Sequence, residues 1–373
     1  MVAAHTDCVA IADSAGPFGS TIQSDALRPS MQRFLDIERV LAMYPPDCLP
    51  GDAESLGAAG GFSGAKIWRV SAARGKLCLR RWPREGPDEP RLKWLQGIVA
   101  QAAVGGFCLL PPIIATRCGD GFCRHDRYLW ELTTWLPGKA DYWSDPRPVK
   151  LSAAATALAQ FHAAVESRPR ASDQASVVVP RSRASPSPGM AERLTMVHRL
   201  RAGALLELRA AVRRNRDAMS IVADRAEEML DLVYPHLSAL HHDLDAASRI
   251  AVPLQPCLRD IWHDHVLFEG DQVSGIIDVG SMRVDTVAAD IARLLGSFCG
   301  NDHDGWTIGL RAYESVRPIS EPERVLVETF DRSQMMLAGV NWVKWVFAER
   351  RTFGDPAAVV ERMEHILSRL RKT

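Results

Sequence analysis

The stretch that most constrains this chain runs from Cys257 to Gly280 and reads CLRDIWHDHVLFEGDQVSGIIDVG. It contains two short apolar runs separated by the turn sequence EGD, a pattern typical of a β-hairpin. Asp260 precedes the first run and Asp278 ends the second, so such a hairpin would bring the two carboxylates to one point. Metal-assisted phosphoryl transfer needs this layout, with one acid orienting the attacking hydroxyl and the other holding magnesium. A surface hairpin with two solvated acids fits the stretch equally well.

The composition is that of a folded protein and argues against several kinds of partner. The 373 residues suffice for two domains or for one two-lobed enzyme, and 47% of them are hydrophobic against 24% charged. Lysines plus arginines equal aspartates plus glutamates at 45 each, so nothing favours nucleic acid or an anionic membrane as a partner. The eight cysteines lack a framework spacing, and we expect neither a signal peptide nor a membrane span. We therefore predict a cytoplasmic protein.

The first part of the chain has the sequence pattern of a small sheet. Residues 1–54 are predicted to form a loose arm that ends in a short helix over Met31–Met43. Residues 55–138 contain several strand-like runs and one helical stretch over Glu89–Ala103. This segment therefore predicts a small, mostly antiparallel sheet accompanied by one helix.

The remainder of the chain, residues 139–373, is mainly helical in its apolar periodicity. Within it, residues 166–189 are rich in Ser, Pro and Arg and predict a flexible loop. Two long helices, over about 190–217 and 218–241, are expected to follow that loop.

A glycine-rich segment precedes a strand near the start of the predicted sheet. It reads AAGGFSGA over residues 58–65, and a strand follows it, whereas a helix follows the Rossmann and Walker loops. Glycines at a hairpin tip let backbone N–H groups approach phosphate oxygens without interference from a Cβ atom. We therefore predict Gly61, Ser63 and Gly64 as phosphate-binding residues, with an ordinary flexible hairpin as the alternative.

Seven motifs occur along the chain in this order: GGFSGA, LCLRRW, WELTTWLPG, LAQFH, RDIWHDHVLF, IIDVG and DIARLL. Over roughly residues 55–300 they resemble, in the same order, the motifs of the aminoglycoside phosphotransferase and choline kinase family. Order over such a length is more specific than any single motif. The resemblance implies an α+β, protein-kinase-like two-lobed fold, with a small antiparallel-sheet N-lobe and a mainly helical C-lobe.

The resemblance also assigns roles to the charged residues of these motifs. Asp260 corresponds to the catalytic aspartate, which accepts or orients the proton of the substrate hydroxyl. Asp278 corresponds to the magnesium ligand that bridges the nucleotide phosphates. Arg80 stands where the family usually has lysine, and arginine keeps the charge and can hold a phosphate through two N–H groups. Glu89 is the nearest acid on the following helix and is expected to pair with Arg80.

Three further segments acquire expected roles in the same way. The hinge segment Glu131–Trp135 would line the adenine, with Thr133 and Trp135 as predicted contacts. Asp290, at the start of DIARLL, is expected to be either an N-terminal helix acid or a clamp on the catalytic loop. The acidic segment Asn301–Gly305 would suit an amine-bearing acceptor if it faced the acceptor site.

Two positions depart from the family pattern. His265 replaces the usual asparagine, and Leu258 replaces a histidine two residues before Asp260. Magnesium prefers oxygen ligands, so an imidazole is a poor replacement. His265 is therefore predicted as a ligand in a site that uses one metal, prefers manganese or recruits Asp264, with a nucleotide-binding pseudokinase as the alternative. His263 and His265 on one face of a strand also allow a zinc site, and hence a zinc-dependent hydrolase.

We predict an ATP-dependent phosphotransferase that moves the γ-phosphate to a hydroxyl group of a small molecule, in the manner of aminoglycoside, choline or homoserine kinases. ATP and Mg²⁺, or Mn²⁺ in its place, are the expected cofactors. The expected partners are the nucleotide and a small-molecule hydroxyl acceptor, with no nucleic acid and no membrane. The sequence does not identify the acceptor and leaves a monomer and a homodimer equally open.

Overall fold

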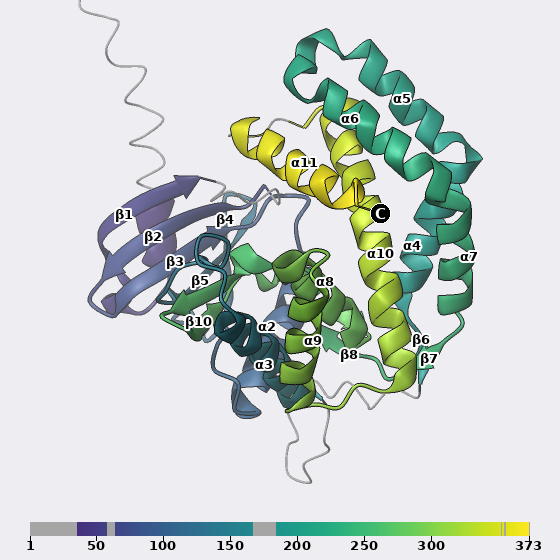
Figure 1. Ribbon diagram of the computed structural model, residues 1–373. Coiled ribbons are helices and arrows are strands. Elements are labelled where there is room, and N and C mark those ends of the chain that lie inside the picture. The colour runs from purple at the N-terminus through teal and green to yellow at the C-terminus, as the bar shows by residue number, and fades with distance from the viewer. Residues whose placement is uncertain (1–35, 58–63, 167–183, 352, 354–355, 373) are drawn as a thin grey trace, which may run out of the picture.

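The computed structural model of the protein describes residues 36–57, 64–166, 184–351, 353 and 356–372. These residues form a small lobe built on a β-sheet and a larger lobe built mainly of helices (Figure 1). Gly61, Ser63 and most of the predicted flexible loop 166–189 lie outside the described residues. Among the described residues, no helix is both long and apolar enough to cross a membrane.

The small lobe is a five-stranded antiparallel sheet with the strand order β1-β2-β3-β5-β4. Its strands are β1 (Pro50–Gly57), β2 (Lys66–Ala72), β3 (Gly75–Arg81), β4 (Phe122–His125) and β5 (Tyr128–Thr134). Successive side chains of a strand point to opposite faces. In β3, Leu77 and Leu79 are buried in the core of the lobe, and Cys78 and Arg80 face the other way, into a cavity between the lobes.

The residues that precede the sheet contribute to its core. Residues 36–41 are helical, and Val40 and Leu41 are buried together with apolar side chains of the sheet. This helical segment lies within the helix predicted over Met31–Met43. Strand β1 begins at Pro50, so the predicted end of an N-terminal arm at residue 54 falls inside the sheet.

Helix α2 (Glu89–Val104) coincides with the helix predicted over Glu89–Ala103. The carboxylate of Asp88 caps it by accepting a hydrogen bond from the backbone N–H of Arg91, 2.9 Å away. Its apolar face packs against helix α3 (Pro148–Val165) in the main core. The later turns of α2, including Leu95 and Gln96, reach the cavity between the lobes.

The larger lobe contains helices α3 to α11 (Figure 1). After α3 come α4 (Pro188–Arg199), α5 (Leu205–Arg214), α6 (Ser220–Val233), α7 (Leu237–Ala247), α8 (Val287–Cys299), α9 (His303–Glu314), α10 (Glu321–Val343) and α11 (Pro356–Leu370). Helix α8 packs against α10, and α3 packs against α9. Helix α11 packs on α6 and α10, which brings the C-terminal helix into the body of the lobe.

The prediction of two long helices between residues 190 and 241 is wrong, because this region forms four helices, α4 to α7. A π-helical turn over Leu200–Ala204 separates α4 from α5, and Gly203 within it has a φ of +129°. Residues with a side chain rarely adopt this conformation, so glycine permits the kink. The proline of the 3-10 turn Tyr234–His236 lies between α6 and α7. Apolar periodicity continues across both breaks and therefore did not indicate them.

The predicted hairpin around the two acids is confirmed. Two antiparallel pairs hold this region, namely β8 (Gln255–Cys257) with β11 (Arg283–Asp285), and β9 (Val266–Glu269) with β10 (Gln272–Ile276). Gly270 lies in the turn of the hairpin with a φ of +60°, which favours glycine. The paired strands on either side bring the loop that carries Asp260 next to the loop that carries Asp278.

Candidate active site

A cavity between the lobes takes its walls from both of them. Its apolar lining includes Ile67 and Cys78 from the sheet, Leu136 from the hinge, and Leu267 and Ile277 from the hairpin. An apolar slot of this kind suits the flat face of a purine base, with backbone groups of the hinge at its edge. The predicted site residues that line it are Arg80, Thr133, Trp135 and Asp278.

Gly64 is the member of the predicted phosphate-binding loop that the structure describes. Its φ is +72°, and an added Cβ atom would meet Pro83 at 3.7 Å, which is an ordinary contact. The backbone conformation therefore favours glycine here, whereas the surrounding space would admit a larger side chain. Phosphate binding by Gly61, Ser63 and Gly64 stays a prediction.

Arg80 is the central cation of the cavity. Its Nη1 atom lies 3.1 Å from Oδ1 of Asp278, and Glu131 lies directly opposite it on the neighbouring strand β5. The side chain of Gln96 on α2 donates a hydrogen bond of 2.8 Å to Glu131. Burial lowers the pKa of Arg80, but the charges of Asp278 and Glu131 outweigh it and raise the pKa above its ordinary value. Arg80 is therefore a fully charged side chain held between two acids.

The predicted pair between Arg80 and Glu89 does not form. Glu89 bonds instead to Arg124 on β4, at 2.6 Å from Nη2, and both side chains are largely exposed. Glu89 is the first residue of α2, two helical turns before Gln96, and it does not line the cavity that Gln96 reaches. The acid beside Arg80 comes from the strand next to it, so Glu131 takes the place that the sequence analysis gave to Glu89.

Asp260 is half exposed, and one of its oxygens is held by an arginine. Nε and Nη2 of Arg293 on α8 lie 3.1 and 2.9 Å from Oδ1 of Asp260. Oδ2 has no hydrogen-bond partner among the described residues, so it is available to a substrate hydroxyl. Burial raises the pKa of Asp260, but the charges of Arg293 and Arg362 and the hydrogen bonds from Arg293 outweigh it, so the pKa lies below its ordinary value.

The loop that carries Asp260 is clamped by a buried acid. Asp290 is fully buried, and its two oxygens each accept a 2.6 Å hydrogen bond, one from the backbone N–H of Leu258 and one from that of Arg259. His162 on α3 lies 3.1 Å from the same carboxylate. Arg259 has a φ of +68°, a conformation that costs free energy and needs such support. Of the two roles expected for Asp290, the contacts support the clamp.

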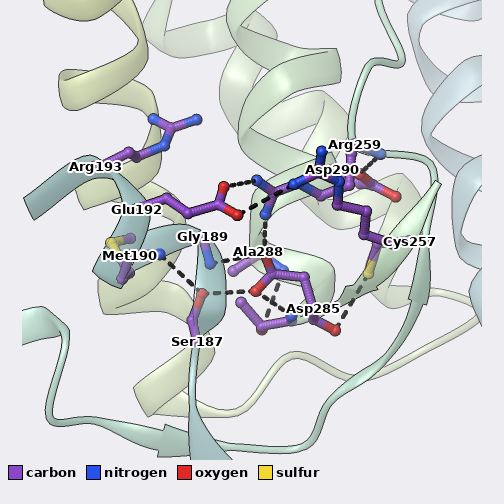
Figure 2. A network of polar contacts seen from close by, with 12 residues as sticks. Ser187, Gly189, Met190, Glu192, Arg193, Cys257, Arg259, Asp285, Ala288 and Asp290 are labelled. Atoms are coloured by element: carbon purple, nitrogen blue, oxygen red, sulfur yellow. Dashed lines mark hydrogen bonds and ion pairs between the residues drawn. The ribbon is translucent and has the colours of Figure 1, made fainter. Parts of the chain in front are cut away.

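A second network ties the same loop to α4 (Figure 2). The guanidinium of Arg259 extends toward Glu192 and Asp285, and it lies 3.3 Å from a carboxylate oxygen of Glu192. Asp285 is almost fully buried and also accepts hydrogen bonds from the Ser187 hydroxyl and the backbone N–H of Gly189 at the start of α4. The side chain and the backbone of Arg259 are thus fixed from two directions.

His265 has hydrogen bonds at both ring nitrogens. Nδ1 lies 2.7 Å from the backbone oxygen of Asp260, and the Trp262 indole donates to Nε2 over 3.0 Å. The ring therefore carries its proton on Nδ1, and the lone pair of Nε2 faces the indole N–H. Nε2 lies 3.8 Å from Oδ2 of Asp278, so metal binding by His265 would require the bond to Trp262 to break. In this arrangement His265 holds the catalytic loop and offers no free ligand atom.

The donor atoms of the site fit a hard cation with a single protein carboxylate. Asp278 adopts the left-handed conformation at φ 57° and ψ 56°, and its Oδ2 has no hydrogen-bond partner among the described residues. Mg²⁺ commonly binds through one or two carboxylates and completes its shell with phosphate oxygens and water. Asp278 therefore supplies the one carboxylate that such an ion needs. Arg80 lies beside Asp278, close enough to contact the phosphates that the ion would bind.

Among the residues that the structure describes, His263 and His265 do not belong to a group of three side chains close enough to share a zinc ion. Within the described part of the chain, the group of three side chains close enough to share a metal is His162, Cys257 and Asp290, all buried. Each of them already has a hydrogen-bond partner. His263 is stacked against Trp143 with ring centres 3.6 Å apart.

Arg293 and Gln96 are the site residues that the sequence analysis missed. Arg293 lies three residues after Asp290, so both face the catalytic loop from one side of α8. That spacing was a usable signal, because the helix was expected to follow the second acid. Gln96 follows the buried residue Leu92 by four positions, but a lone glutamine on an amphipathic helix carries no functional signal.

Comparison with known proteins places these features in a family. A sequence model of the phosphotransferase enzyme family matches residues 56–325. A homoserine kinase of Gluconobacter oxydans is 30% identical over 118 residues, which are 29% of this chain and 37% of that protein. The chain thus matches well under half of the length of this curated relative.

Two solved structures resemble the fold over nearly its whole length. A spectinomycin phosphotransferase in complex with ADP and spectinomycin has a TM-score of 0.59 at 11% identity, covering 91% of this chain and 97% of that one. An amicoumacin kinase in complex with AMP-PNP, Ca²⁺ and its antibiotic has a TM-score of 0.57 at 13% identity, covering 95% and 97%. At such identities the likeness establishes the fold, and the predicted two-lobed, kinase-like architecture is confirmed.

Proposed function

The chain belongs to the phosphotransferase enzyme family, and from this premise we propose that it is an ATP-dependent kinase acting on a hydroxyl group of a small molecule. The observation that carries the proposal is that His265 links the two acids beside a cavity that suits a nucleotide, because Nδ1 lies 2.7 Å from the backbone oxygen of Asp260 and Nε2 lies 3.8 Å from Oδ2 of Asp278. The similar structures that contain ADP, or AMP-PNP with Ca²⁺, support a nucleotide and a divalent cation as ligands.

The nucleotide is proposed to enter the cavity with its base on the apolar lining. Thr133 and Trp135 line the cavity at the hinge, and Arg80 lies at the end that holds Asp278. Arginine can bind a phosphate through two N–H groups, so Arg80 would exchange part of its contact with Asp278 for the nucleotide. Asp278 would hold the cation, which neutralises phosphate charge during transfer.

Asp260 is proposed to receive the proton of the attacking hydroxyl. Its Oδ2 is free among the described residues, and Arg293 fixes the carboxylate through Oδ1. The low pKa of Asp260 keeps this group ionised at neutral pH. The clamp from Asp290 and the bonds of His265 fix the backbone on both sides of Asp260, so the base is positioned before substrate binds.

The substitution Asp260→Asn tests the proposal directly. Transfer of labelled γ-phosphate from ATP to an acceptor panel should fall by about 10²–10⁴, because the amide cannot take the proton. Binding of ADP, measured by calorimetry, should be retained. The matched control is Asp245→Asn. Asp245 lies on α7 and forms an exposed ion pair with Arg249, so this variant should behave like the wild type.

Two results would contradict this function. Turnover that is unchanged in Asp260→Asn would remove Asp260 from its role. Wild-type protein that binds ATP with Mg²⁺ or Mn²⁺ and transfers phosphate to no acceptor would favour the pseudokinase alternative, for which the replacement of the usual asparagine by His265 is the motivating observation.

A further inference from the structure

Two arginines from different helices converge on one tryptophan of the catalytic loop. The guanidinium carbon of Arg362 on α11 lies 3.8 Å from the ring centre of Trp262, and that of Arg293 on α8 lies 5.6 Å from it. Trp262 follows Asp260 by two residues, so both cations flank the proposed catalytic base. Both helices belong to the larger lobe, and neither arginine is among the residues that line the nucleotide cavity.

The two arginines differ in their partners. Arg293 is paired with Asp260 through Nε and Nη2, which leaves its Nη1 without a partner among the described residues. Arg362 has neither a hydrogen bond nor a carboxylate within 4 Å in the part of the chain that the structure describes. Burial and the charge of Arg293 lower the pKa of Arg362 to about 10, although Asp264 and Asp260 oppose the shift. It remains a cation at neutral pH, and none of the described carboxylates forms a close ion pair with it.

The nearest acids, Asp260 and Asp264, attract Arg362 electrostatically, but neither forms an ion pair with it within 4 Å. Asp264 is half exposed and its nearest basic contact is His263, at 3.2 Å. Burial lowers the pKa of His263 to about 2 and that of His365 to about 4, so both rings are neutral. A half-buried pair of like charges is unfavourable, and a bound anion would relieve it.

We propose, on the basis of the proposed kinase function, that the phosphate acceptor carries an anionic group, a carboxylate or a phosphate, which binds Arg362 and the free N–H of Arg293. The planar guanidinium matches both anions through paired hydrogen bonds. An acceptor anchored in this way would present its hydroxyl to Oδ2 of Asp260, because Arg293 contacts the other oxygen of that carboxylate. The anchor lies on α11, outside the segment 56–325 that the family model matches.

The expectation of an amine-bearing acceptor, which rested on Asn301–Gly305, stays a prediction. Asp302 is the N-terminal cap of α9 and accepts the backbone N–H of Asp304, so its carboxylate is used within the helix start. The charge nearest to Asp260 is that of arginine. A cationic acceptor would add to the repulsion there, whereas an anionic one removes it.

Two matched series of acceptors test the proposal on the wild-type protein. The first is glycerate, glycerol 3-phosphate, glycerol and 3-amino-1,2-propanediol, and the second is 4-hydroxybutyrate, 1,4-butanediol and 4-amino-1-butanol. The kcat/KM for transfer of labelled phosphate should be at least tenfold higher for an anion than for its neutral partner, and lowest for the amine. Preference among the anions identifies carboxylate or phosphate as the recognised group.

Substitutions of Arg362 then locate the recognition. The ratio of kcat/KM for the preferred anion over its neutral partner should fall about ten- to a hundredfold in Arg362→Gln and less in Arg362→Lys. In Arg362→Glu the order should reverse in favour of the amine. Because each ratio is taken within one variant, partial unfolding affects both of its terms equally. Arg371→Gln, which removes an exposed pair with Glu228 just beyond α11, is the control and should keep the wild-type ratio.

The outcomes separate this proposal from the one on which it rests. Wild-type protein that binds or hydrolyses ATP but prefers neutral or amine acceptors, or phosphorylates no anion, overturns the anionic acceptor and leaves nucleotide binding intact. An unchanged ratio in Arg362→Gln overturns the anchor. Absence of ATP binding to the wild type overturns the proposed function itself.

Discussion

The two sides of the catalytic hairpin differ in how their charges are balanced. On the nucleotide side, Arg80 lies between Asp278 and Glu131, so the cation has acids on two sides before any ligand binds. On the other side, Arg362 lies near Arg293 and has no carboxylate within 4 Å among the described residues. A nucleotide with its cation brings charges of both signs and needs groups of both signs. On the opposite side, Asp260 and Asp264 act on Arg362 only from a distance, so its guanidinium is left without a close ion pair that an anionic ligand could supply.

The two sides also differ in how their residues are distributed along the sequence. On the nucleotide side, Arg80, Glu131 and Asp278 each lie within one of the motifs quoted above, although Arg80 and Asp278 are 198 residues apart along the chain. The residues around Trp262 come from the catalytic loop, α8 and α11, which are separated by long stretches of chain. We therefore expect substitutions on each side to affect one ligand and spare the other, and the following four variants test this separation.

The largest effect is expected for Asp278→Ala on the nucleotide side. Loss of the carboxylate removes several kcal/mol of charge stabilisation, which corresponds to a fall of about a thousandfold in transfer rate. Calorimetry should show that Mg²⁺ tightens ATP binding to the wild type and not to the variant. Asp271→Ala in the turn of the same hairpin is the control. If Mg²⁺ still tightened ATP binding to Asp278→Ala, another group would have to hold the cation.

Asp290→Ala should damage both sides together, because Asp290 supports the loop between them. It leaves two backbone N–H groups and His162 without their shared acceptor in a fully buried site. We expect the free energy of unfolding to fall by about 3 kcal/mol, measured by urea denaturation. The surviving folded protein should show slower transfer, because the left-handed conformation of Arg259 loses its support. A loss confined to one ligand would show that Asp290 does not serve both sides.

The sequence predicted the parts of the site that depend on short-range spacing. The hairpin, the places of Asp260 and Asp278, and the position of Arg80 on a cleft-facing strand all follow from local patterns. It also predicted the fold, because the order of motifs over a long segment restricts the possible architectures. The hairpin and the strand positions depend on neighbouring residues in the chain, whereas the fold depends on the order of the motifs.

The parts that failed depend on tertiary packing. The choice of Glu89 as the partner of Arg80 assumed that the start of α2 faces the cleft, but two further turns separate it from the part that does. The expected role of His265 as a metal ligand is a different case and stays a prediction, although the Trp262 indole donates a hydrogen bond to its Nε2. Arg362 lies about 100 residues beyond the catalytic loop, in a helix whose spacing indicates only an amphipathic surface.

A smaller effect should show whether Glu131 or Glu89 is the acid that positions Arg80. Burial raises the pKa of Glu131, whereas the charge of Arg80 and the hydrogen bond from Gln96 lower it, so the ionised form depends on these contacts. Glu131→Gln removes one counter-charge and should raise the KM for ATP about tenfold, the effect of one charge-assisted contact. Glu89→Gln should leave it unchanged, since that side chain is exposed and paired with Arg124. The reverse result would restore Glu89 as the acid that positions Arg80.

The smallest effect is a displacement of the pH profile in Arg293→Gln, on the side opposite the nucleotide. Burial alone raises the pKa of Asp260, and Arg293 is the largest of the charges that hold it below its ordinary value. A carboxylate must lose its proton to act as a base, so wild-type kcat/KM should stay level as the pH falls from 7 to about 4. Without Arg293 the pKa of Asp260 rises, and the acidic limb should move to higher pH, while ADP affinity stays the same. Arg371→Gln should retain the wild-type profile. Coincident profiles for Arg293→Gln and the wild type would mean that Asp260 is not the group whose protonation limits transfer.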